Sequence, residues 1–85
     1  MELTTLRCEI DAIDRELLAL YLRRATLSDR IGAYKKSVGA PVYQPERETE
    51  KLRALTAGLS AEEAAEVEAL FQTLFLLSRK RQEAL

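Results

Sequence analysis

The sequence has no histidine and no tryptophan, and it has one cysteine in 85 residues. Without histidine there is no imidazole to act as a general base or as a metal ligand. The single Cys8 cannot form a disulfide within the chain, and without a histidine partner it is a poor nucleophile. The three glycines form no phosphate-binding loop. These absences argue against catalysis by an imidazole base, a histidine-bound metal, a thiol nucleophile or a Gly-rich phosphate loop.

Neither sign of charge is in excess, because 13 Lys and Arg stand against 14 Asp and Glu. Proteins that bind nucleic acid or an anionic membrane surface carry a clear surplus of basic residues. We therefore expect no nucleic-acid partner and no membrane partner. Any bound anion must be held by a few positioned cations.

No apolar run approaches the length of a membrane span, and the first residues lack the basic and apolar regions of a signal peptide. A lone cysteine also gives no sign of an oxidising compartment. These features predict a cytoplasmic protein. With 47% apolar residues in 85, the chain is close to the lower limit for burying a core alone.

Apolar residues recur at alternating steps of three and four along the first part of the chain, a heptad pattern that predicts one long helix. We expect this helix over residues 5–38, capped by Thr4 or Thr5 and ended by Gly39 with Pro41. The apolar seam consists of Leu3, Leu6, Ile10, Ile13, Leu17, Leu20, Leu27, Ile31, Tyr34 and Val38.

Two shorter helices are expected after a loop at residues 39–44. Pro45 suits the first position of a helix over residues 45–57. Ser60 and Glu63 have the spacing of a capping box, which predicts a third helix over residues 61–84. The fold class predicted from these signals is all-α, with one long, one short and one medium helix.

The length of the first helix predicts a dimer. A helix of about 33 residues is about 50 Å long, whereas a compact globule of this size has a diameter of about 30 Å. The apolar seam that protrudes needs a cover, and a second copy of the chain supplies one. We therefore expect an intertwined helical homodimer.

The apolar seam has one error, because Arg24 stands where a Leu or Ile belongs. A guanidinium in such a place needs an anionic partner, unless it reaches outward to solvent or pairs with a carboxylate of another helix. Lys35 lies about 20° round the same helix from Arg24. Alone, Lys35 suits a solvated helix end, but the two cations together could hold one anion.

The third helix shows a matching break, since its apolar stripe continues into the polar Ser78 and Gln82. Either the stripe ends here, or these side chains face a polar cavity. Their basic neighbours Arg79, Lys80 and Arg81 are expected to complement the helix dipole and to face water.

Packing the three helices together could bring these polar positions around one cavity that suits a small dianion with a hydroxyl group. Arg7 stands 17 residues before Arg24, about 25 Å along the helix, so it cannot reach the same ligand in its own chain. In an antiparallel dimer it could serve the partner's site, although it also fits an ordinary surface position. The residues expected at the cavity are Arg24, Lys35, Arg47, Glu48, Ser78 and Gln82.

At these positions the chain resembles the small all-helical chorismate mutases. The segments LRCEIDAIDRELLALYLRR, IGAYKK, PVYQPERE and LFLLSRKRQ stand in the order of that family and at nearly its spacing. The resemblance covers essentially the whole chain and implies a single chorismate mutase domain over residues 1–85. It also implies an intertwined homodimer that converts chorismate to prephenate, in the branch of the shikimate pathway that leads to phenylalanine and tyrosine.

The resemblance implies a site residue by residue. Arg7 would be lent to the partner's site, and at Gln44 some relatives carry an aspartate near the substrate hydroxyl, where a main-chain contact could survive the change. The implied substrate-binding residues are Arg7, Arg24, Lys35, Gln44, Arg47, Glu48, Ser78 and Gln82, of which Lys35, Gln82, Arg24 and Glu48 are the implied catalytic residues.

The implied reaction is a unimolecular Claisen rearrangement, which makes this an isomerase that needs no nucleophile, metal, cofactor or proton transfer. The arginines would bind the two carboxylates, with Ser78 orienting one of them. Lys35 and Gln82 would donate to the ether oxygen, on which negative charge develops. Glu48 would accept from the ring hydroxyl.

Two other functions stay open at this point. An isochorismate-pyruvate lyase has the same fold, but the similar lyases have an apolar residue where this chain has Glu48. A non-enzymatic helical dimer would use the polar breaks to set register. The chain could also work alone, or in a complex with another aromatic-pathway enzyme.

Overall fold

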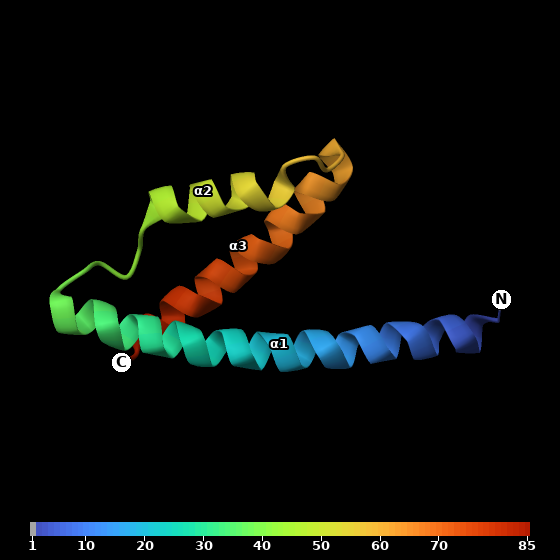
Figure 1. The fold of residues 1–85 in the computed structure, drawn as a ribbon, viewed down its shortest axis with the longest axis horizontal. Coiled ribbons are helices and arrows are strands. Elements are labelled where there is room, and N and C mark those ends of the chain that lie inside the picture. Colours follow the sequence, from blue (N-terminus) through green and yellow to red (C-terminus); the bar gives the residue numbers. More distant parts are fainter. Residues whose placement is uncertain (1) are drawn as a thin grey trace.

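The computed structural model describes residues 2–85, and within them it contains three α-helices and no strand. Helix α1 spans Leu3–Val38, α2 spans Pro45–Thr56, and α3 spans Ala61–Glu83 (Figure 1). The prediction of an all-helical chain with three helices is confirmed. Within the same residues, no helix is both long and apolar enough to cross a membrane.

The molecule is elongated because α1 runs along its whole length (Figure 1). Its principal extents are 54 × 27 × 15 Å, and its radius of gyration is 16.1 Å. A compact chain of this size would have a radius of gyration of about 12 Å. The 36 residues of α1 therefore extend well beyond what the rest of the chain covers.

Local sequence signals define the C-terminal end of α1 better than its N-terminal end. The expected cap by Thr4 or Thr5 is wrong, because both residues lie inside the helix and Glu2 is the N-cap without a side-chain cap bond. The main-chain N–H of Leu6 reaches the Glu2 carbonyl at 3.2 Å, which starts the helix earlier. Gly39 ends it as predicted, in the left-handed conformation with φ 72°.

The starts of α2 and α3 follow their local sequence signals. Pro45 occupies the first turn of α2, where its missing N–H has no helical partner to lose. At α3 the capping box is confirmed, since the Glu63 N–H donates to Ser60 Oγ at 3.1 Å and the Ser60 N–H donates to Glu63 Oε1 at 3.5 Å. These caps fix where both helices begin.

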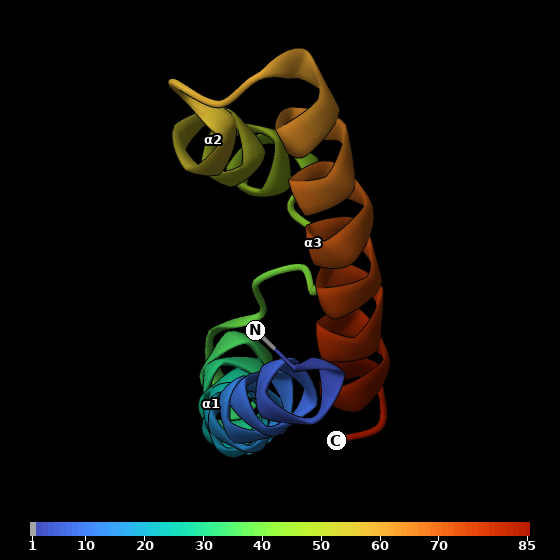
Figure 2. The ribbon, with the colours of Figure 1, turned by 90° about the vertical axis from the view of Figure 1, so that its right-hand side faces the viewer.

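Helix α3 packs against both other helices and bridges them (Figure 2). The α1 side of this contact has small buried residues, Ala25, Ser28 and Gly32, which let the helices approach closely. A Cβ added at Gly32 would lie 2.7 Å from Cγ of Gln82 and 2.8 Å from Cδ1 of Leu85. The end of α3 is thus seated directly on the second half of α1.

Little of the apolar seam is buried within one chain. Among the described residues, the buried apolar side chains are Ala25 and Phe75, whereas Leu3 is 61% exposed and Ile10 is 58% exposed. An exposed apolar surface of this extent marks an interaction site. The first half of α1 has no cover from the other two helices in Figure 1.

Candidate functional site

A cavity of about 340 Å³ lies between the second half of α1, the start of α2 and the end of α3. Side chains that are far apart in the sequence meet there because α3 bridges the other two helices (Figure 2). The lining consists of Arg24, Leu27, Ser28, Ile31, Lys35, Gln44, Arg47, Glu48, Lys51, Phe75, Ser78 and Gln82.

Seven of the eight residues expected to bind substrate line this cavity, and Arg7 does not. Arg7 is exposed on α1, about 25 Å along the helix from Arg24. The cavity thus gathers cations and neutral polar groups from all three helices against an apolar wall that includes Ile31 and Phe75.

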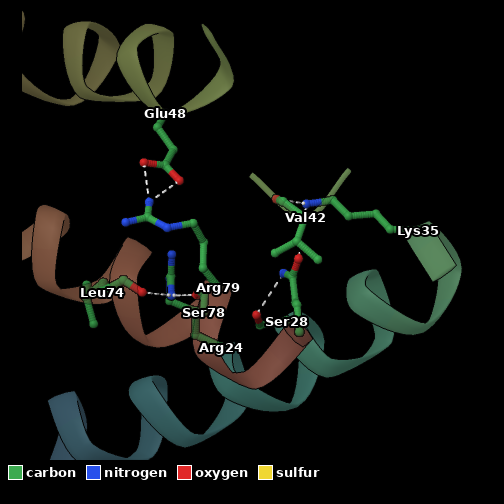
Figure 3. A network of polar contacts seen from close by, with 9 residues as sticks. Arg24, Ser28, Lys35, Val42, Glu48, Leu74, Ser78 and Arg79 are labelled. Atoms are coloured by element: carbon green, nitrogen blue, oxygen red, sulfur yellow. Dashed lines mark hydrogen bonds and ion pairs between the residues drawn. The ribbon is translucent and has the colours of Figure 1, made fainter. Parts of the chain in front are cut away.

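Arg24 is fixed by neutral partners. Its Nη1 donates to Ser78 Oγ at 2.7 Å and to the Leu74 carbonyl at 3.4 Å (Figure 3). Arg24 forms no ion pair with any residue among 2–85, so no carboxylate of the described chain compensates its charge. A guanidinium held in this way keeps other N–H groups for an anionic ligand.

Lys35, Gln82 and Ser28 form a second chain of hydrogen bonds, of which Figure 3 labels Lys35 and Ser28. The Lys35 ammonium donates to the Val42 carbonyl at 2.9 Å and to Gln82 Oε1 at 3.1 Å. Gln82 Nε2 in turn donates to Ser28 Oγ at 3.0 Å. An ammonium has three N–H donors and an amide has two, so Lys35 and Gln82 each keep one N–H without a partner within residues 2–85.

Glu48 is held by a basic residue that we expected to face water. Arg79 Nη1 donates to Glu48 Oε1 at 2.6 Å and to Oε2 at 2.5 Å (Figure 3). Donating to the Glu48 carboxylate raises the pKa of Arg79 above its ordinary value. The Arg79 guanidinium also lies 4.9 Å from the ring centroid of Tyr43. The expectation that Arg79 faces water is wrong, because α3 turns this side chain toward α2.

Arg81 also has a partner. Its Nε and Nη2 donate to the two carboxylate oxygens of Asp29 at 3.0 and 2.8 Å, and this hydrogen bonding lowers the pKa of Asp29. This second ion pair is exposed and joins α3 to α1 outside the cavity lining. Arg81 is exposed as expected, and Asp29 is its ion-pair partner at the surface.

Lys51 is a cavity residue that sequence reasoning missed. Its Nζ lies 6.0 Å from the ring centroid of Phe75. Burial lowers the pKa of Lys51, and the nearby charges of Arg24 and Arg47 lower it further. Its position four residues after Arg47 places both on one face of α2, which is the sequence signal that could have revealed it.

Gln44 and Arg47 stand where the connecting loop enters α2. Gln44 is the N-cap residue of α2 and makes no side-chain cap bond. Arg47 is exposed at the cavity edge and forms no ion pair within residues 2–85. Both side chains are therefore available to a ligand at this edge.

The cavity lining carries four cations, Arg24, Lys35, Arg47 and Lys51, and one carboxylate, that of Glu48. Because Glu48 is already paired with Arg79, the charge left for a ligand is strongly positive. Fold and site together define an all-helical protein whose cavity has a charge that suits a small anion with more than one negative charge.

Comparison with known families identifies this helical protein further. A sequence profile of chorismate mutase type II matches residues 6–83. The chain belongs to this family, which confirms the resemblance seen in its sequence.

Several known proteins are similar to this chain. The T-protein of Haemophilus influenzae is 43% identical over 65 residues, which are 71% of this chain and 17% of that protein. The bifunctional chorismate mutase/prephenate dehydratase of Aquifex aeolicus is 51% identical over 49 residues, 58% of this chain and 14% of that protein. The 4-amino-4-deoxychorismate mutase of Streptomyces venezuelae is 48% identical over 46 residues, 54% of this chain and 45% of that protein.

A solved structure supports the fold. A conserved hypothetical protein from Pyrococcus furiosus superposes with a TM-score of 0.78 at 31% identity, covering 94% of this chain and 93% of its own. The matches to the curated relatives, in contrast, span less than half of the length of those proteins.

Proposed function

We propose that this chain is a chorismate mutase that converts chorismate to prephenate in the cavity between its three helices. One observation carries the proposal: seven of the positions predicted from the sequence line one cation-rich cavity. Some of these positions interrupt apolar patterns, and the others are implied by the resemblance to the family. Membership of the family and the name of the Aquifex aeolicus relative support the choice of substrate. A dianion with a hydroxyl group suits the charges of the site.

The rearrangement is unimolecular, so the protein acts by holding the flexible substrate in a compact, chair-like geometry and by stabilising developing charge. Arg24 and Arg47 would bind the two carboxylates, since a guanidinium offers paired donors. The Ser78 hydroxyl already accepts from Arg24, which leaves its own hydrogen to donate to a carboxylate.

Lys35 and Gln82 would each direct the remaining N–H at the ether oxygen of the substrate. Both groups are held in place before a ligand binds, by Val42 and by Ser28. Donors that are already oriented cost little reorganisation as charge builds up on that oxygen. Glu48 would accept from the ring hydroxyl, and Gln44 would contribute a main-chain contact beside it.

We propose further that the working protein is an intertwined homodimer. The exposed apolar seam of the first half of α1 gives a second copy of the chain a large surface to cover. In an antiparallel arrangement the partner subunit's Arg7 would reach the cavity, which supplies the cation that one chain alone cannot place there.

The setting proposed for this dimer is the cytoplasm, where it would work alone or with another aromatic-pathway enzyme. The bifunctional name of the Aquifex aeolicus relative supports such an association, because it joins two activities in one protein. The segment that matches this chain makes up 14% of that protein, so most of that protein lies outside the match.

The decisive test of the reaction is a spectrophotometric assay of chorismate loss with the product identified. Prephenate supports the proposal, whereas salicylate plus pyruvate from isochorismate would assign the lyase reaction. Replacing Lys35 or Arg24 by Ala should lower kcat by about 10²-fold to 10³-fold while the protein stays a helical dimer. Wild-type turnover in either variant would overturn the site.

A further inference from the structure

The cavity contains one cation to which neither the sequence pattern nor the proposed reaction gives a role. Lys51 projects from α2 one turn after Arg47 and lines the same space as Arg24 from α1. Three basic side chains from two helices thus border one part of the cavity.

No anion of the described chain neutralises Lys51. The ion pairs within residues 2–85 are Arg79–Glu48 and Arg81–Asp29, and Lys51 belongs to neither. Glu48, which lies one turn before Lys51 on α2, is paired with Arg79 instead. Burial and the two arginines lower the pKa of Lys51, which means that its charged form is destabilised in the free protein.

A purely structural role accounts for only part of this arrangement. The aliphatic part of a lysine can cover an aromatic ring, and its ammonium can interact with the ring face. The distance of 6.0 Å from Lys51 Nζ to the Phe75 centroid lies at the outer limit of that interaction. The contact explains why a long side chain fits beside Phe75, and it does not explain why the side chain is charged.

We propose that Lys51 is a substrate-binding residue whose ammonium donates to a carboxylate of the dianionic substrate, beside Arg47. The inference deepens the proposed function and rests on it. A carboxylate carries its charge both before the rearrangement and at the transition state, so Lys51 stabilises both states by a similar amount. Its loss therefore raises KM and leaves kcat nearly unchanged, in contrast to the loss of Lys35.

The test compares Lys51→Met with the wild type, because methionine keeps an unbranched apolar chain beside Phe75 and removes the charge. A charge-assisted hydrogen bond of ordinary strength predicts a KM for chorismate raised about tenfold or more, with kcat within about twofold. Lys51→Arg should restore a KM near that of the wild type. Lys80→Met, at an exposed lysine outside the cavity lining, is the matched control and should leave KM unchanged.

Thermal unfolding of the ligand-free proteins separates this role from a structural one. Removing a cation that faces two arginines should leave Tm unchanged or raise it. A wild-type KM in Lys51→Met, or a lower Tm with no change in KM, would overturn the assignment.

The assignment also has a readout that does not depend on turnover. A dicarboxylate mimic of the transition state should raise Tm less in Lys51→Met than in the wild type. If the wild type binds this mimic but leaves chorismate unchanged, the proposed function fails while the smaller shift still supports Lys51. An equal shift in both proteins would contradict the role of Lys51 alone.

Discussion

Arg79 on α3 donates from one guanidinium nitrogen to both carboxylate oxygens of Glu48 on α2, at 2.6 and 2.5 Å. This contact joins the two helices at the edge of the cavity, with both side chains partly buried. It holds the Glu48 carboxylate in one orientation before a ligand binds, which is what an acceptor for the substrate hydroxyl needs.

Replacing Arg79 with Leu should therefore lower both Tm and kcat/KM, the latter by about tenfold, because it leaves a partly buried carboxylate without its partner. Steady-state kinetics and thermal unfolding measure the two effects. In a Glu48→Gln background the same replacement should reduce kcat/KM much less, since Arg79 acts through Glu48. Equal losses in both backgrounds would show that Arg79 does not act by positioning Glu48.

The exposed Arg81–Asp29 pair provides the comparison. Its side chains are 44% and 37% exposed, and it lies outside the cavity lining. Exposed ion pairs contribute little because solvent and salt screen them. Arg81→Leu should change neither kcat/KM nor KM, and a loss equal to that of Arg79→Leu would contradict this distinction.

Gly32→Ala should impair activity more than it impairs folding. The added Cβ would lie 2.7 Å from Gln82 Cγ and 3.0 Å from Gln82 Cβ, so the Gln82 side chain must move. Its contacts with Lys35 and Ser28 would then be disturbed. We expect kcat to fall by at least about tenfold with helix content unchanged, measured by kinetics and circular dichroism.

The same change tested in a Gln82→Ala background shows whether the effect passes through Gln82. There the Gln82 Cγ at 2.7 Å is absent, and the Leu85 Cδ1 that remains at 2.8 Å belongs to a side chain outside the cavity lining, so Gly32→Ala should have little further effect on kcat. A full additional loss would mean that the change distorts the contact between α1 and α3 itself.

Lys51 should contribute to the pH dependence of the stability of the ligand-free protein, and Lys51→Met should remove this contribution. The pKa of Lys51 is below 10.5 in the folded state, with Arg24 facing it from α1 and Arg47 from α2. As the pH rises through this lowered pKa toward 10.5, the folded state releases the proton while the unfolded state keeps it. The free energy of unfolding of the wild type should therefore rise relative to that of Lys51→Met.

Denaturant unfolding of both proteins over this pH range measures the difference. The comparison with the variant cancels the other lysines and tyrosines that titrate there. If the difference in the free energy of unfolding stays constant with pH, or changes in the opposite direction, the charged form of Lys51 is not destabilised in the folded state.

Ile10→Glu should disrupt the proposed dimer. Ile10 lies in the first half of α1 and is 58% exposed in the single chain, so a carboxylate there costs one chain little. In a dimer the same carboxylate would be buried against the partner without a counter-ion. Sedimentation should show monomers with no chorismate turnover, and an active dimer would contradict this use of α1.

The sequence was sufficient for the helices and for much of the cavity. The helix ends at Gly39 and Ser60 follow from local hydrogen bonding, which sequence motifs report directly. Arg24, Ser78 and Gln82 stood out because they interrupt apolar patterns that were otherwise regular.

Sequence reasoning missed the residues whose roles depend on the angles between helices. Arg79 and Lys51 lie among other charged residues on their helices, where a solvent-facing position is the ordinary expectation. Only the way in which α3 bridges α1 and α2 turns Arg79 toward Glu48 and Lys51 toward Phe75. The early start of α1 depends on the main-chain carbonyl of Glu2, which no side-chain motif reports.

Mixing two inactive variants tests the central claim, a catalytic cavity completed by a second copy of the chain. Arg7→Ala and Arg24→Ala, each with little mutase activity alone, are unfolded together, refolded and assayed for conversion of chorismate to prephenate. In each mixed dimer, one site combines Arg24 of the Arg7→Ala chain with the partner subunit's Arg7, and the other site lacks both arginines. Random pairing makes about half of the dimers mixed, so about a quarter of the wild-type activity should return. Activity that stays at the level of the separate variants would contradict the account.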